Sequence, residues 1–229
     1  MELKFQSFGG KIFRPQPEVL VHKELGLFAV VTPWGPQFQT KEVLSSLIQN
    51  YETYSSDEEV TAVYSPLNSL SPEENVFRQA VLSCNEQVFK EQNKESEYTF
   101  GYEMVCGVVR QQQILFIQVG HPYIYLDRSD IPLQPMGHVL DLASGFSRLP
   151  QNPPPLPSQL LGLYSDMHFS VFRLPVEKTD RLLFISRSFI PVSVITAPRK
   201  ERTLNRIARC LAEDNQNIPF WIGLLDLTD

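Results

Sequence analysis

Few residues in this sequence combine a reactive side chain with the spacing that catalysis needs. The four histidines stand singly, and none has the spacing of a metal-binding pair on a helix or strand. The three cysteines include no Cys-x-x-Cys pair, so we interpret them as small buried thiols. Glycine-rich phosphate loops and Gly-x-Ser-x-Gly motifs are absent from the sequence, and these residues alone predict no catalytic site. The histidines are His22, His121, His138 and His168, and the cysteines are Cys84, Cys106 and Cys210.

The elements that must position any site are helices and a larger number of strands. Thr40–Tyr51, Ser71–Val88 and Leu204–Leu211 carry apolar residues at helical spacing, and the second opens with the capping-box pattern Ser71-Pro-Glu-Glu. Short apolar runs bounded by turn residues predict the strands. These are Gly26–Val31, Val60–Tyr64, Met104–Val109, Ile114–Val119, Tyr123–Leu126, Phe169–Phe172, Leu182–Ser186, Val192–Thr196 and Phe220–Leu225.

The order of these elements indicates a fold class. Polar connections such as Arg110-Gln-Gln-Gln are typical of antiparallel hairpins, and the helices do not follow every strand. We therefore expect an α+β fold with a single domain over residues 1–229. The stretch Pro150-Gln-Asn-Pro-Pro-Pro-Leu-Pro (150–157) is interpreted as a rigid internal loop, with a ligand for SH3-like partners as the alternative.

Composition narrows the classes of partner. The chain is 42% hydrophobic and 20% charged, which favours a globular protein. Its net charge of −6 argues against nucleic acid or anionic lipid, and Arg199-Lys200-Glu201-Arg202 is interpreted as a solvated helix start. No apolar stretch approaches the roughly 20 residues that span a bilayer, so we expect a cytoplasmic protein.

Several apolar segments that end in turns follow one another along nearly the whole chain. They are Gly10-Lys-Ile-Phe-Arg-Pro-Gln-Pro-Glu-Val, Leu25-Gly-Leu-Phe-Ala-Val-Val-Thr-Pro-Trp-Gly-Pro, Leu115-Phe-Ile-Gln-Val-Gly-His-Pro-Tyr-Ile-Tyr-Leu-Asp-Arg, Asp180-Arg-Leu-Leu-Phe-Ile-Ser-Arg-Ser-Phe and Leu211-Ala-Glu-Asp-Asn-Gln-Asn-Ile-Pro-Phe-Trp-Ile. In this order they resemble the metal-dependent serine/threonine protein phosphatases of the 2C type, the PPM family. The resemblance implies a sandwich of two antiparallel sheets flanked by helices.

The resemblance also implies a reaction that this sequence is poorly equipped to perform. In that family two divalent cations, commonly manganese or magnesium, activate a water that attacks phosphoserine or phosphothreonine. Such cations need several carboxylate ligands. At the family's ligand positions this sequence has Thr32 for aspartate, Pro33 for glycine, and Arg187 and Gln216 for two further aspartates, while Glu18 is retained. A guanidinium at a ligand position repels the cation.

We therefore expect no two-metal centre, no metal cofactor and no phosphatase activity. The predicted function is that of a pseudophosphatase, a binding or regulatory module for an unidentified protein partner. Arg14, at the position where the family holds the substrate phosphate, and Arg187 are candidates for binding a phosphorylated peptide or another anion. The alternative is that Arg14 pairs with Glu18 and Arg187 with another carboxylate, which leaves a plugged cleft.

An active manganese- or magnesium-dependent phosphatase with rearranged ligands is the competing hypothesis. Its ligands would come from Glu18, Asp141, Asp166 or Asp180. Trp34 is interpreted either as an interface residue or as a lid over the vacated cleft, and Trp221 as core. His121 and His138 are interpreted as structural polar groups with satisfied hydrogen bonds.

Overall fold

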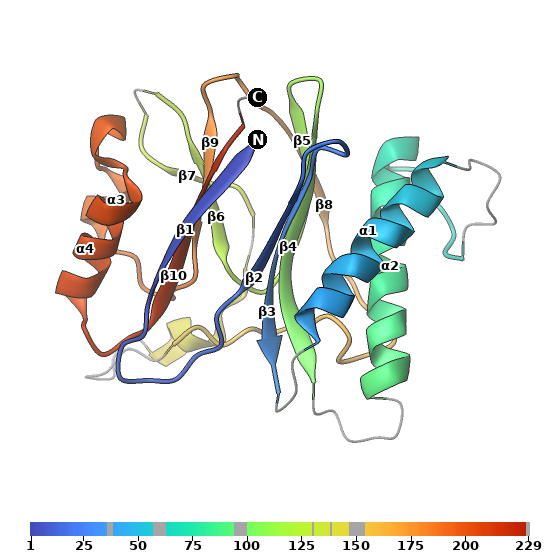
Figure 1. Cartoon of the computed structure of the whole chain (residues 1–229), viewed down its shortest axis with the longest axis horizontal. Helices are drawn as coiled ribbons and strands as arrows, with labels where there is room; N and C mark the ends of the chain where they lie inside the picture. Colours follow the sequence, from blue (N-terminus) through green and yellow to red (C-terminus); the bar gives the residue numbers. More distant parts are fainter. Residues whose placement is uncertain are drawn as a thin grey trace.

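The computed structural model describes residues 1–35, 39–56, 63–93, 100–129, 131–137, 139–146 and 154–227. Within them, ten strands form two five-stranded antiparallel sheets (Figure 1). The first sheet has the order β1 (Glu2–Phe8), β10 (Phe220–Asp226), β9 (Arg181–Ile185), β6 (Tyr123–Asp127) and β7 (Gln134–Pro135). The second has the order β2 (Glu18–His22), β3 (Leu27–Trp34), β4 (Gly101–Arg110), β5 (Gln113–Val119) and β8 (Val171–Pro175).

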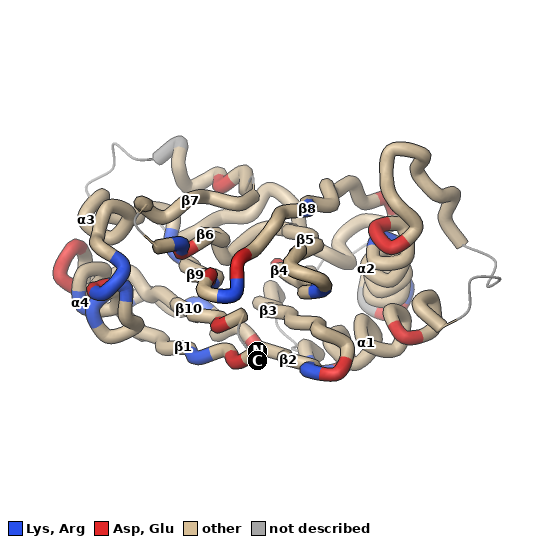
Figure 2. Tube along the Cα trace, turned by 90° about the horizontal axis from the view of Figure 1, so that it is seen from above, with Lys and Arg blue, Asp and Glu red and all other residues tan. Residues whose placement is uncertain are grey.

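Helices cover the outer face of each sheet. Helices α1 (Thr40–Ser56) and α2 (Pro72–Gln92) lie at one end of the long axis, while α3 (Val192–Ile195) and α4 (Leu204–Asp214) lie at the other (Figures 1 and 2). Two short 3₁₀ helices, η1 (Leu142–Phe146) and η2 (Arg199–Glu201), lie in connections. Among the described residues, no helix is long and apolar enough to cross a membrane. The layers therefore follow the order helix, sheet, sheet, helix, as the α+β prediction requires.

Strand β3 shows why its sequence is a continuous apolar run. Phe28 and Val30 pack between the two sheets, and the alternate residues Leu27, Ala29 and Val31 pack under α1 and α2. All five are fully buried because both faces of this sheet are covered. The strand thereby brings Thr32, next on the face of Phe28 and Val30, to the end of the space between the sheets.

Most of the predicted elements are confirmed. The three expected helices correspond to α1, α2 and α4, and the capping box of α2 is present, with Ser71 and Glu74 bonded to each other's backbone amides. Six of the expected strands correspond to β3, β4, β5, β6, β9 and β10, and the run expected at Phe169–Phe172 forms β8 two residues later. The periodicity of apolar residues was sufficient to predict the helices and strands that are buried.

Other predictions were wrong or incomplete. The run Val192–Thr196, expected as a strand from its β-branched residues, is helical in α3, because Val194 packs against α4 and tertiary packing outweighs strand propensity. Strands β1 and β2 were not predicted, since both are sheet edges in which no side chain is fully buried. Of the strand expected at Val60–Tyr64, residues 60–62 lie outside the described residues, and Val63 and Tyr64 are not in a strand.

The proline-rich loop is described only in part. Residues 150–153 lie outside the described residues, as does His138. The described remainder bonds to the domain, since the amide of Leu156 donates to Asp141 Oδ1 over 3.0 Å and Pro157 forms a β-bridge with Asp141. This half of the loop is therefore held against the sandwich, at the residue that leads into η1.

Candidate functional site

The candidate site lies where β3 ends and β4 begins, in the space between the sheets. Thr32 and Glu103 are directly opposite each other in the ladder of β3 and β4. They lie on the same face as Val30 and Val105, which belong to the core between the sheets. Both are fully buried, so a carboxylate has been placed in an apolar environment and must be paired there.

Glu103 is paired on both of its oxygens. Its Oε2 lies 2.5 Å from Nη2 of Arg14, and its Oε1 accepts from the backbone amide of His121 over 3.0 Å. The Nδ1 atom of the His121 ring lies 2.8 Å from the same Oε1. Gly120 makes this possible: its φ is +72°, and a Cβ there would lie 2.8 Å from Cγ of Glu103. Glu103 thus joins the N-terminal segment to the turn between β5 and β6.

A second carboxylate, that of Asp141, closes the cluster. Its Oδ2 lies 3.4 Å from Nε2 of His121, so the imidazole stands between two carboxylates. Its Oδ1 accepts from the amides of Ala143 and Leu156 at 2.9 and 3.0 Å. The result is a continuous chain of contacts, Arg14–Glu103–His121–Asp141, which we call the cleft cluster.

The pKa values of three groups in the cleft cluster are shifted, and each shift favours the charged form. Burial alone would raise the pKa of Glu103, but Arg14 and His121 lower it overall. Burial also opposes the charge on Asp141, yet the neighbouring His121 ring and the hydrogen bond from the amide of Leu156 bring its pKa down to about 2. Burial lowers the pKa of His121, and the bonds to Asp141 and Glu103 outweigh this and raise it. Counted with both basic groups protonated and both carboxylates ionised, the cluster carries no net charge.

Thr32 and Pro33, at two of the family's metal-ligand positions, are buried but carry no carboxylate. Thr32 is fully buried and its hydroxyl has no hydrogen-bond partner within the described residues. Pro33 does not end the strand as expected, because β3 continues to Trp34 with Pro33 opposite Tyr102. Strand β2 ends its pairing at Val31, so Pro33 has one free side and its missing N–H breaks no ladder bond.

The side chains of Arg187 and Gln216 are not part of the cleft cluster. The guanidinium of Arg187 is buried; its Nη1 donates to the carbonyl of Leu211, and its Nη2 lies 2.6 Å from Oδ2 of Asp214, at the end of α4. Gln216 is exposed in the turn that follows α4. The two anion-binding candidates therefore share no partner, because Arg14 bonds to Glu103 on the other sheet.

Glu18 is exposed at the start of β2, and Arg14 pairs with Glu103 rather than with Glu18, the partner considered from the sequence. The guanidinium of Arg14 also lies 5.9 Å from the ring centre of Trp34, so this tryptophan packs against the cleft cluster. Trp221 is 3% exposed and belongs to the core, as expected.

Sequence reasoning missed Glu103. The signal was present in the sequence. Glu103 lies near the start of a strand, among residues that are all buried, and it shares the inward face of that strand with Val105. A charged residue in that pattern needs a buried partner. Its partners Arg14 and His121 are 89 and 18 residues away in the chain, so only the fold identifies them.

Comparison with known proteins was informative at the level of structure. No family model matches the sequence, and no curated protein matches it. Among solved structures, the PPM Ser-Thr phosphatase MsPP from Mycobacterium smegmatis, in complex with cacodylate, superposes with a TM-score of 0.68 at 17% identity, covering 99% of this chain and 98% of MsPP. The chain has the fold of the PPM phosphatases.

Two further structures support the same fold. The catalytic domain of the phosphatase PstP, in complex with two manganese ions, gives a TM-score of 0.64 at 13% identity, over 100% of this chain and 98% of that one. PppA, a key regulatory component of T6SS in Pseudomonas aeruginosa, superposes with a TM-score of 0.64 at 14% sequence identity, covering 97% of this chain and 96% of PppA. The sheet sandwich is therefore the phosphatase 2C-like one that the sequence resemblance predicted.

The residues of this PPM-type cleft do not fit two divalent cations. A pair of such ions needs several free oxygen ligands, but all carboxylate oxygens of the cleft cluster contact Arg14, His121 or backbone amides. Over the described part of the chain, no three His, Cys, Asp or Glu side chains form a group that could hold a metal. Of the alternative ligands, Asp166 is exposed and Asp180 is bonded to Arg128.

Proposed function

We propose that this chain is a catalytically inactive phosphatase 2C-like domain that acts as a binding or regulatory module. The observation that carries the proposal is the cleft cluster. Arg14 and His121 supply positive charge beside Glu103 and Asp141, in the space between the sheets where the fold family places its cations. Side chains of the protein thus neutralise the carboxylates that are left.

The electrostatics explain why this arrangement disfavours metal. A metal ion would have to displace Arg14 or His121 from a buried carboxylate and leave that cation without a partner in an apolar environment. A displaced guanidinium would keep its positive charge, with no carboxylate left to balance it. Displacement of Arg14 would therefore cost an unpaired buried charge in addition to the dehydration of the ion.

The ligand of such a module would most naturally be an anion at Arg14. One guanidinium nitrogen is used by Glu103, while Nε and Nη1 are buried without a hydrogen-bond partner among the described residues. Guanidinium groups bind phosphate oxygens through paired N–H groups. A phosphorylated peptide would bind these two donors, without being hydrolysed, once the buried Arg14 side chain moves toward the surface. Arg187 is not part of this proposal, since Leu211 and Asp214 occupy its guanidinium.

An active manganese- or magnesium-dependent phosphatase is the second candidate. It is favoured by one observation, that Glu103 and Asp141 both lie within 3.4 Å of the His121 ring. Release of His121 would leave two carboxylates facing each other across the space it fills, which is the beginning of an oxygen-rich site.

Hydrolysis assays separate the two candidates. The protein is incubated with p-nitrophenyl phosphate and with a phosphothreonine peptide in millimolar manganese, with a manganese-dependent PPM phosphatase as the positive control. We expect no turnover above the rate without protein. Metal-dependent turnover that is lost in Asp141→Asn but kept in the matched exposed variant Asp166→Asn would overturn the proposal in favour of the enzyme.

A further inference from the structure

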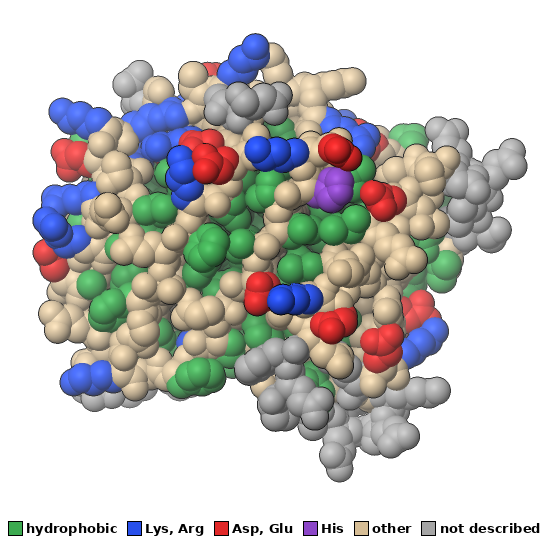
Figure 3. All heavy atoms as spheres, viewed as in Figure 1, with side chains coloured by type: hydrophobic (Ala, Val, Ile, Leu, Met, Phe, Trp, Pro, Cys, Tyr) green, Lys and Arg blue, Asp and Glu red, His purple; other side chains and the backbone are tan. Residues whose placement is uncertain are grey.

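Positive charge is concentrated at the end of the molecule that carries α3 and α4. Residues 178–214, which end with α4, contain eight lysines and arginines against four acidic residues, in a chain whose net charge is −6. On the face drawn in Figure 3, lysine and arginine side chains lie together with acidic side chains at the left, on the side of α4 in Figure 1, while hydrophobic side chains occupy the middle. Such an asymmetry creates a local field that the net charge of the chain conceals.

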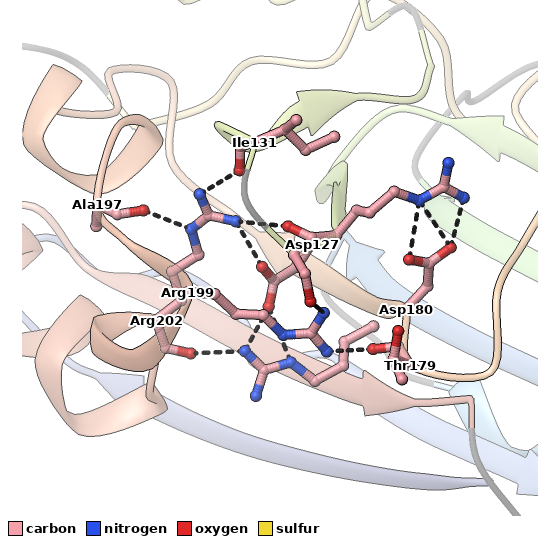
Figure 4. A network of polar contacts seen from close by, with 10 residues as sticks. Asp127, Ile131, Thr179, Asp180, Ala197, Arg199 and Arg202 are labelled. Atoms are coloured by element: carbon pink, nitrogen blue, oxygen red, sulfur yellow. Dashed lines mark hydrogen bonds and ion pairs between the residues drawn. The ribbon is translucent and has the colours of Figure 1, made fainter.

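A buried carboxylate holds this segment in place. Asp127, at the end of β6, is fully buried and bonds to Nε of Arg181 at 2.8 Å and to Nη1 of Arg202 at 2.7 Å (Figure 4). Arg202 also donates from Nε to the carbonyl of Ala197 over 2.7 Å and from Nη2 to that of Ile131. These bonds fix η2 and the start of α4 on the sheet, so the cations beside them are held in place.

The outer cations are not neutralised in the same way. Arg199 bonds to the hydroxyl of Ser129 at 2.9 Å and to the carbonyl of Thr179, neither of which carries charge. Within the described residues, no carboxylate forms an ion pair with this arginine or with four exposed neighbours. The five unpaired cations are Lys178, Arg199, Lys200, Arg206 and Arg209.

A small, largely apolar cavity lies beside one of these cations, Arg206. It has a volume of about 290 Å³, its apolar wall includes Val194, Ile207 and Cys210, and Arg206 and Glu201 stand among its polar lining residues. Close by on α3, Val192 is 74% exposed, which is unusual for a large aliphatic side chain. An apolar cavity beside an exposed cation can accept an apolar side chain whose neighbours in the sequence are acidic.

We propose that the surface formed by α3, η2 and α4 docks an acidic peptide segment of a protein partner, with one apolar side chain in the cavity. Nucleic acid fits less well, because none of the residues that line the cavity is aromatic and could stack on a base. This proposal concerns a surface outside the cleft cluster and does not depend on the proposed function.

The probe is a short fluorescein-labelled peptide of aspartate and glutamate around one leucine, followed by fluorescence anisotropy with the full chain. The test variant is Lys200→Glu with Arg206→Glu, two exposed positions. The matched control is Lys23→Glu with Lys41→Glu, which changes the net charge equally at two exposed positions outside this surface. Circular dichroism and thermal unfolding verify that every variant folds like the original protein.

We expect binding that weakens with salt, that becomes at least about tenfold weaker in the test variant and that persists in the control. Replacing the leucine of the peptide by serine should weaken binding as well, because the cavity is then left empty. Absence of binding, equal loss in both variants, or indifference to the leucine would overturn the proposal. It would also be overturned if an oligothymidylate or anionic vesicles bound more tightly than the peptide with the same dependence on Lys200 and Arg206.

Discussion

The cleft cluster and the α3–α4 surface both gather cations, yet they use them in opposite ways. In the cleft cluster, Arg14 and His121 face Glu103 and Asp141 and are buried with them. On the α3–α4 surface, one buried carboxylate pairs the inner arginines, and among the described residues no carboxylate forms an ion pair with the outer cations. Buried charges must be paired for the chain to fold, whereas unpaired exposed charges are available to a partner. The first region therefore contributes to stability and the second to binding.

The largest expected effect comes from removing the charge of Glu103. In Glu103→Gln, Arg14 and His121 lose the carboxylate that both contact, and each is left buried without it. We expect a loss of about 3–5 kcal/mol in the free energy of unfolding. Urea denaturation measures it, with Glu18→Gln as the exposed control. Equal stability of the two variants would show that the cleft cluster does not hold the fold together.

A somewhat smaller loss is expected at the inner clamp of the α3–α4 surface. Asp127→Asn leaves the buried Arg202 without its carboxylate, but Arg181 is partly exposed and can turn to solvent. We expect a loss of about 3 kcal/mol by urea denaturation, together with weaker binding of the acidic peptide. If peptide binding were unchanged while stability fell, the clamp would be structural only and the surface would not depend on it.

The pH dependence of stability reports on His121. Because its pKa is raised in the folded protein, its contribution is fully present below its ordinary value of 6.5 and is lost as the pH rises through the native pKa. We expect His121→Gln to be less stable than the original protein by about 2 kcal/mol near pH 6, with a gap that narrows toward alkaline pH. Urea denaturation near pH 6 and at alkaline pH measures the stability difference between the two proteins. A difference that stays constant with pH would mean that the ring is neutral.

The smallest expected effect on stability is at the outer cations. Lys200→Glu with Arg206→Glu should change the free energy of unfolding by no more than about 0.5 kcal/mol, although it should abolish most peptide binding. The same urea experiment measures it beside Lys23→Glu with Lys41→Glu. A loss as large as that of Asp127→Asn would show that these cations stabilise the fold and would remove the contrast between the two regions.

Buried elements could be predicted from the sequence, and exposed edges could not. The apolar run at Phe28–Val31 and the capping box at Ser71 carry strong local signals. Strand β1 is an edge with few buried side chains, so no alternation marks it. The helix α3 contradicts the β propensity of its own residues, because its packing against α4 comes from distant parts of the chain.

The loss of metal-ligand residues at the candidate site could be predicted from the sequence, whereas the side chains that fill the cleft could not. The changed residues at Thr32, Pro33 and Gln216 were visible as departures from the family's motifs. The partners that fill the cleft were not, since Glu103 belongs to none of those motifs and meets Arg14 only in the folded protein. The direction of the Arg187 side chain, toward α4, was also invisible to motif comparison.

Calorimetric titration of the protein with manganese tests the central claim, that a neutral cluster of side chains stands where the fold family places two metal ions. At neutral pH and millimolar manganese, we predict no saturable binding heat, because Arg14 and His121 already neutralise Glu103 and Asp141. Saturable binding of two ions per chain that is lost in Asp141→Asn would contradict it.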